Sequence, residues 1–139
     1  MAIRVLVTDG MDAGAMEQLR KDGFEVVEQF YEPDQLGAAL KDFDAVIIRS
    51  ATKIKKQQID DAKGGKLKLI IRAGVGMDNI DIPYAEAAGI ACKNTPRASS
   101  NAVAELAISL LFSCARSISI AGHTMRENKW EKKAYSKGF

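Results

Sequence analysis

Two arginines stand where apolar segments of the chain end, and both have the chemistry to bind an anion. Arg49 follows the run Ala45 to Ile48, and Arg72 follows the run Leu67 to Ile71. A guanidinium group carries a fixed positive charge and can donate two parallel hydrogen bonds to a carboxylate or a phosphate. If the fold brings both arginines to one crevice, they indicate a small anionic ligand.

The segment after Arg72 reads Ala73-Gly74-Val75-Gly76. The two glycines let the backbone turn and expose amide N–H groups to which an anion can bind. The same spacing also fits a simple tight turn between a strand and a helix. Arg49 by itself also fits a solvated charge at a strand end, and Asn94 fits a cap on the segment that follows it. The residues alone leave these alternatives open.

The elements that must position these residues follow a regular alternation. Strand-length apolar runs are Ile3 to Val7, Phe24 to Val27, Ala45 to Ile48, Leu67 to Ile71 and Ile90 to Cys92. Helical stretches between them are Ala13 to Lys21, Pro33 to Leu40, Lys55 to Lys63 and Ile82 to Ala88. Apolar strands joined by helices require parallel pairing with right-handed crossovers. The pattern predicts an α/β fold, a flavodoxin-like doubly wound parallel sheet with strand order 2-1-3-4-5.

In such a sheet, ligands bind outside the carboxyl ends of the strands, near the switch in strand order. The third, fourth and fifth strands are neighbours in the predicted order. The loops that carry Arg49, Arg72 to Gly76 and Asn94 should therefore lie side by side. We expect no metal site, and we interpret Cys92 and Cys114 as reduced core residues because they have neither CxxC spacing nor histidine partners.

After the fifth strand we expect one long crossover helix, from Asn101 to about Ala121. Its apolar stripe consists of Val103, Leu106, Ala107, Leu110, Leu111, Cys114, Ile118 and Ala121. Further apolar residues occupy the opposite side, so the helix should be buried and should need a second domain or subunit to cover it. Its apolar run falls short of the roughly 20 residues that span a bilayer, so we expect no membrane partner.

Beyond this helix the chain is polar, basic and without periodicity, as a connection would be. We expect residues 1–98 to form the N-terminal part of a substrate-binding domain and residues 99–139 to be the crossover helix and tail. The net charge of +2, from 20 basic and 18 acidic residues, does not favour nucleic-acid binding. Basic residues around Trp130 leave nucleic-acid binding by the tail as an alternative. The first residues read as a strand instead of a signal peptide, so we expect a cytoplasmic protein.

Three motifs along the chain resemble the D-2-hydroxyacid dehydrogenase family, and within it the phosphoglycerate dehydrogenases. They are IIRSATK, LIIRAGVGMDNIDIPYAEAAGIACKNTP and SSNAVAELAISLL, in that order. The resemblance covers essentially the whole chain. It implies an NAD-dependent oxidoreductase acting on a small anionic 2-hydroxy acid, with 3-phosphoglycerate in serine biosynthesis as the favoured substrate. An enzyme of the glyoxylate, hydroxypyruvate or lactate type is the alternative.

The resemblance also implies roles for individual residues. The backbone amides of Arg72, Ala73 and Gly74 would bind the substrate carboxylate, Arg49 and Arg72 would hold its anionic substituent, and Asn94 would lie close by. Val75 would contact the nicotinamide end of the cofactor, and Glu105, expected in the first turn of the crossover helix, would lie on the cofactor side. A homodimer formed through the helix and tail would bring Lys132 and Lys133 to the neighbouring subunit's substrate pocket.

The same resemblance implies that the catalytic groups lie beyond Phe139. These are the dinucleotide fingerprint, a catalytic arginine and a glutamate–histidine pair, so we expect residues 1–139 to be inactive by themselves. His123 is interpreted as a surface or packing residue. A phosphoacceptor signalling domain of the same strand order is the alternative from another class. It agrees with Asp9, but Arg49-Ser50 stands where the phosphoacceptor aspartate is expected.

Overall fold

The computed structural model describes residues 2–137, and the chain divides into two compact units, residues 1–98 and residues 99–139. The first unit contains a five-stranded, wholly parallel sheet in the order β2-β1-β3-β4-β5. The strands are β1 (Arg4–Val7), β2 (Glu25–Glu28), β3 (Ala45–Ile48), β4 (Leu69–Arg72) and β5 (Ala91–Asn94). The α/β fold and the strand order predicted from the sequence are confirmed.

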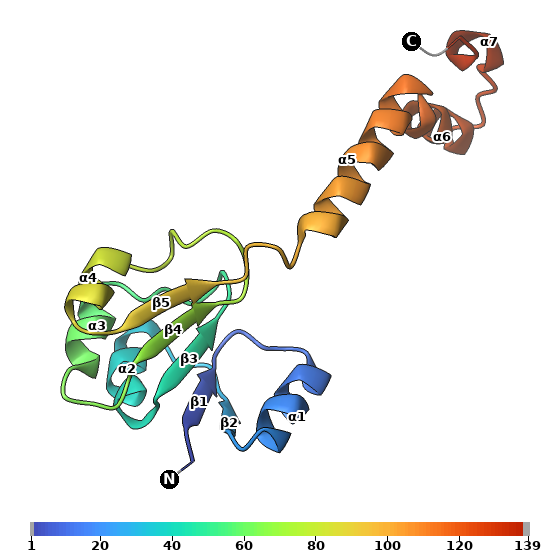
Figure 1. Cartoon of the computed structure of the whole chain (residues 1–139). Helices are drawn as coiled ribbons and strands as arrows, with labels where there is room; N and C mark the ends of the chain where they lie inside the picture. Colours follow the sequence, from blue (N-terminus) through green and yellow to red (C-terminus); the bar gives the residue numbers. More distant parts are fainter. Residues whose placement is uncertain (1, 138–139) are drawn as a thin grey trace. The chain divides into compact units, whose positions relative to one another are not determined.

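Helices cover both faces of this sheet (Figure 1). They are α1 (Ala13–Lys21), α2 (Pro33–Ala39), α3 (Lys56–Ala62) and α4 (Ile82–Ala87), with a short 3-10 turn at Leu40–Asp42. Helices α2, α3 and α4 lie on one face, and α1 lies on the other. This arrangement is that of a doubly wound sheet, in which successive parallel strands are joined by helices packed on the two faces.

The central strand β3 shows how the core is divided. Its four residues are all buried, and they alternate between the two faces as strand geometry requires. Val46 and Ile48 belong to the cluster that packs against α2, α3 and α4, whereas Ala45 and Ile47 belong to the smaller cluster beside α1. Two separate apolar layers therefore hold β3 firmly, and the loop that leaves its carboxyl end starts from a fixed point.

Four of the five strands differ by one or two residues from the bounds predicted from the sequence, and the fourth and fifth differ most. The fourth strand begins at Leu69 instead of Leu67, and the fifth runs from Ala91 to Asn94 instead of from Ile90 to Cys92. Pairing with β4 in the register Ile71 with Lys93 and Arg72 with Asn94 extends the fifth strand into polar residues. An apolar pattern does not detect such residues at the edge of a sheet.

The second unit consists of helices α5 (Ser100–Ala115), α6 (Ile118–Arg126) and α7 (Lys132–Tyr135). The prediction of one helix from Asn101 to about Ala121 is wrong. Ser117 adopts a left-handed backbone conformation, with φ of 55°, and α5 and α6 meet there at 65°. The expected irregular tail is also wrong, because it contains the end of α6 and the short helix α7. Glu105 is the sixth residue of α5 and not in its first turn.

Helix α5 contains no buried residue, so the described residues do not provide the cover that the sequence predicts this helix needs. Cys114 is likewise exposed and not a core residue, whereas Cys92 is half-buried, and burial raises the pKa of its thiol. Within residues 2–137, no single helix has the length and apolar character to cross a membrane. The bent pair α5 and α6 meets these criteria when both helices are counted together.

Candidate substrate-binding site

The carboxyl ends of three neighbouring strands bring the predicted ligand-binding loops together. Ile48 on β3 pairs with Arg72 on β4, and Arg72 pairs with Asn94 on β5. Arg49, Arg72 and Asn94 therefore stand at the same edge of the sheet, on adjacent strands about 4.8 Å apart. The adjacency of these loops, inferred from the strand order, agrees with the observed sheet.

The loop after β3 is fixed by the carboxylate of Asp9, which follows β1. The backbone amides of Arg49 and Thr52 donate to Asp9 Oδ2 at 2.7 and 3.0 Å. The Thr52 hydroxyl donates to Asp9 Oδ1 at 2.5 Å. Hydrogen bonds to an ionised carboxylate are stronger than those between neutral groups. Asp9 thus joins the ends of two strands, β1 and β3, at the point where the strand order reverses.

The pKa of Asp9 reflects these contacts. Burial has the largest single effect and raises the pKa, because it penalises the charged form. Hydrogen bonds from the Thr52 side chain, from the Thr52 and Arg49 amides and from Thr8 act in the other direction and together lower the pKa below 3.8. Asp9 is therefore ionised at neutral pH and accepts hydrogen bonds there.

A second side chain, Asn79, holds the same loop from the carbonyl side. Its Nδ2 donates to the backbone oxygens of Arg49 and Thr52, both at 2.7 Å. Two carbonyl acceptors require the NH2 group at this position, so the orientation of the amide is determined. Asn79 is only 6% exposed, and its Oδ1 has no hydrogen-bond partner among the described residues.

The loop after β4 wraps the guanidinium of Arg72 against its own backbone. A Cβ added at Gly74 would collide with Arg72 Nη1, so only glycine allows this approach. Arg72 Nε is buried and has no hydrogen-bond partner in residues 2–137. A buried donor of this kind costs free energy until an acceptor reaches it. The arrangement is suited to an incoming carboxylate or phosphate.

The backbone amides of this loop differ in how they are used. The Ala73 amide donates to Ile48 O at 2.8 Å, and the Gly74 amide donates to Arg72 O at 2.9 Å, so two of the three amides expected to bind a substrate carboxylate are already bonded within the chain. In the described part of the chain, the amides of Val75 and Gly76 have no such partner. Asn94 Nδ2 donates to Val75 O at 2.7 Å, which ties the end of β5 to this loop. The Val75 side chain is 51% exposed.

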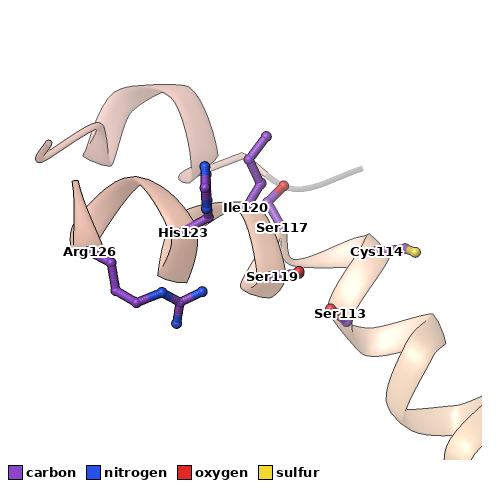
Figure 2. Close-up of a pocket in the computed structure, with 7 residues that line it drawn as sticks. All are labelled: Ser113, Cys114, Ser117, Ser119, Ile120, His123 and Arg126. Carbon is purple, nitrogen blue, oxygen red and sulfur yellow. The ribbon is translucent and has the colours of Figure 1, made fainter.

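The remaining predicted site residues, Glu105, Lys132 and Lys133, lie in the second unit and are exposed. Near the turn at Ser117, this unit has an open hollow of about 600 Å³. Its lining residues are Ser113, Cys114, Ser117, Ser119, Ile120, His123 and Arg126 (Figure 2). His123 Nε2 lies 3.3 Å from Glu127 Oε1 on the surface of α6, and no hydrogen bond among the described residues joins it to Cys114. We assign no chemistry to this hollow.

Comparison with known proteins gives the family. Residues 5–137 match the model of the D-isomer specific 2-hydroxyacid dehydrogenase catalytic domain. The chain belongs to the D-isomer specific 2-hydroxyacid dehydrogenase family.

Two relatives of this chain are named for different activities. Hydroxypyruvate reductase of Thermotoga maritima is 44% identical over 132 residues, which are 94% of this chain and 42% of that protein. D-3-phosphoglycerate dehydrogenase of Sus scrofa is 39% identical over 133 residues, which are 95% of this chain and 25% of that protein. The chain therefore spans less than half the length of each relative.

A solved structure supports the dehydrogenase fold. The NAD+-bound 3-phosphoglycerate dehydrogenase of Entamoeba histolytica superimposes with a TM-score of 0.67 and 33% identity. The match covers 84% of this chain and 40% of that one.

Sequence reasoning missed the two side chains that fix the loop after β3 in this dehydrogenase. In the sequence, Asp9 enters the argument as a residue that agrees with the phosphoacceptor alternative, and Asn79 only as part of the longest motif. Both could have been suspected on one ground: a short polar side chain at a strand end or in a loop often satisfies nearby backbone groups. Their partners lie 27 to 43 residues away in the chain, so no local pattern identifies them.

Proposed function

We propose that this chain is the substrate-binding portion of an NAD-dependent dehydrogenase whose substrate is a small 2-hydroxy acid with a second anionic group. The observation that carries the proposal is the placement of Arg49 and Arg72 at the ends of paired strands, with Arg72 Nε buried and unpartnered among the described residues. One guanidinium serves the carboxylate and the other serves the second anion. The backbone amides of Val75 and Gly76, which have no acceptor within residues 2–137, add donors beside them.

For the substrate itself, the proposal is 3-phosphoglycerate, oxidised to 3-phosphohydroxypyruvate in serine biosynthesis. The 2-hydroxyl carbon would lose a hydride to the nicotinamide of NAD, and the hydroxyl proton would pass to a base that lies outside residues 1–139. The likeness to phosphoglycerate dehydrogenase supports this choice. Hydroxypyruvate reduction is the second candidate, favoured by the 44% identity to a hydroxypyruvate reductase.

By this proposal the chain contacts only part of the NAD cofactor. The half-exposed Val75 side chain, at the tip of the β4 loop, would pack against the apolar face of the nicotinamide ring. Glu105 would lie on the cofactor side. A further domain would bind the rest of the cofactor and supply the acid–base groups. This agrees with the match to this chain, which covers only 42% and 25% of the two relatives' lengths. By this proposal residues 1–139 alone are inactive.

The proposal includes a cytoplasmic homodimer formed through α5, α6 and the tail. Large apolar side chains of α5, such as Leu106, Leu110 and Leu111, are exposed in the single chain and would be covered by a second copy. Lys132 and Lys133 would then approach the partner's phosphate-binding site. Both cysteines are free thiols, which suits a reducing compartment. We propose neither a nucleic acid nor a membrane as a partner.

A ligand titration of the ¹⁵N-labelled chain tests the substrate class directly. Adding 3-phosphoglycerate should shift the amide signals of Arg49, Val75 and Gly76, while signals of α1, on the other face of the sheet, should not move. Hydroxypyruvate, which lacks the phosphate, should bind more weakly if 3-phosphoglycerate is the substrate. Equal affinity for both acids would favour the hydroxypyruvate reductase activity. Shifts confined to other regions would contradict the site.

A further inference from the structure

The loop from Arg49 to Thr52 is held by an unusual set of contacts at both of its ends. The amide N–H groups of Arg49 and Thr52 donate to the Asp9 carboxylate, and their carbonyl groups accept from the Asn79 amide. All four backbone groups at the two ends are therefore satisfied by two side chains. Between the ends, Ser50 and Ala51 are exposed.

The two side chains come from different parts of the sheet edge. Asp9 follows β1, and Asn79 lies between β4 and α4. The loop after β3 is therefore hydrogen-bonded to residues that follow each of the two strands beside β3. Asp9 can only accept and Asn79 Nδ2 can only donate, which matches the two kinds of backbone group that they meet. Thr52 and Asn79 are buried, whereas the Arg49 side chain is exposed. The fixed backbone thus carries a charge that projects into solvent.

We propose that Asp9 and Asn79 are positioning residues, a two-sided clamp that fixes the backbone of Arg49 and so prepares its guanidinium for the anionic substrate. A long charged side chain loses conformational freedom when it binds, and a preset backbone reduces that loss. The role of Arg49 toward the substrate belongs to the proposed function, on which this second step rests. The clamp itself can be tested without any ligand.

Hydrogen exchange of the full chain tests the clamp. In wild type, the amides of Arg49 and Thr52 should exchange at least about tenfold more slowly than those of Ser50 and Ala51 in the same loop. Asp9→Ala should speed the exchange of both amides, because it removes their acceptor. Asn79→Ala should also speed it, because the carbonyl groups of the same two residues lose the donor that holds the loop. Asp61→Ala removes an exposed aspartate from α3 and should change neither rate. Unchanged protection in both clamp variants would overturn the proposal, and melting curves will show that each variant is folded.

The sign of the change in anion affinity separates the clamp from simple electrostatics. Removal of the Asp9 charge by itself should strengthen anion binding, equally in Asp9→Ala and Asp9→Asn. A clamp predicts the opposite for Asp9→Ala, about tenfold weaker binding of 3-phosphoglycerate. Asp9→Asn should keep close to the wild-type affinity, because its amide oxygen still accepts from both backbone N–H groups. Tighter binding in both variants would overturn the positioning role.

A double-mutant cycle asks whether the clamp acts through Arg49. In an Arg49→Ala background, Asp9→Ala and Asn79→Ala should cause no further loss of affinity, because the group that they position is gone. Fully additive losses would contradict the proposal. In an active, longer polypeptide the clamp variants should raise KM with little change in kcat. If wild type binds neither acid, the proposed function fails, and the exchange rates decide the clamp by themselves.

Discussion

The two units of this chain treat their apolar side chains in opposite ways. In the first, large residues such as Leu6, Leu40 and Ile48 are completely buried between the sheet and its helices. In the second, none of the residues of α5 is buried, and Leu106, Leu110 and Leu111 are each more than half exposed. Similar residue types thus stabilise the fold in one unit and offer a surface in the other.

The polar groups follow the same division. At the edge of the sheet in the first unit, side chains such as Asp9, Asn79 and Asn94 are bonded to backbone groups far away in the sequence. Among the described residues of the second unit, the contacts between side chains are short-range, such as those of Glu127 with His123 and with Lys129. The first unit is organised by its own contacts, whereas the second exposes surface that the proposed dimer would cover.

The largest expected effect contrasts one leucine from each unit. Leu40→Ala should lower the free energy of unfolding by about 2–5 kcal/mol, because Leu40 is 0% exposed and its removal leaves a cavity. Leu111→Ala, at a residue that is 65% exposed, should change it by less than about 0.5 kcal/mol in the monomer. Urea denaturation followed by circular dichroism measures both. Equal losses would show that α5 is packed in the single chain and would remove the contrast.

The next effect concerns the polar edge of the first unit. Arg49→Ala should weaken binding of 3-phosphoglycerate by roughly 1.5–3 kcal/mol, about ten- to a hundredfold, because a hydrogen bond to a charged group is lost. Calorimetric titration gives the dissociation constant, and KM in a longer active polypeptide should rise in parallel. Arg20→Ala, which removes an exposed arginine from α1, is the matched control. Unchanged affinity would make Arg49 a solvated charge at a strand end.

The contrast between the units also explains what the sequence could predict. Continuous apolar strands such as β3, separated by helical stretches, are sufficient to predict the sheet order, because burial on both faces restricts the topology. Glycines and arginines at strand ends marked the ligand-binding edge. Asp9 and Asn79 could not be given a role, since their hydrogen bonds depend on which loops the fold brings together.

In the second unit, the apolar pattern predicted a helix but not its interruption. The stripe from Val103 to Ala121 is compatible with helix throughout, and no glycine or proline marks the left-handed residue Ser117. The apolar character of the helix predicts that it needs cover, but it does not show what provides that cover. Burial also requires something to pack against, and the single chain does not bury α5.

A third prediction tests the surface of the second unit. If α5 pairs with its counterpart, Leu110→Glu should weaken dimerisation by at least about 2 kcal/mol, or roughly thirtyfold in dissociation constant, because a charge enters an apolar interface. Sedimentation of wild type and variant across micromolar concentrations gives the two constants. Gln57→Glu introduces the same side chain on the exposed surface of α3 and should leave assembly unchanged. A wild-type chain that stays monomeric would refute the dimer.

The smallest expected effect returns to the first unit and concerns pH. The folded chain holds the pKa of Asp9 below 3.8, so the folded state binds a proton less readily than the unfolded state does. The stability that Asp9 contributes is therefore present above pH 3.8 and is lost as the pH falls through the lower, folded-state pKa. The effect should be modest because Asp9 is only partly buried and solvent screens its interactions. Urea unfolding of wild type and Asp9→Asn between pH 7 and about pH 3 isolates it, since Asp60, whose pKa is also lowered, titrates in both proteins. The stability advantage of wild type should shrink toward acid pH. A constant difference at every pH would mean that the carboxylate of Asp9 is no better stabilised in the folded chain than in the unfolded one, which would weaken the contrast between the organised edge of the sheet and the exposed helices.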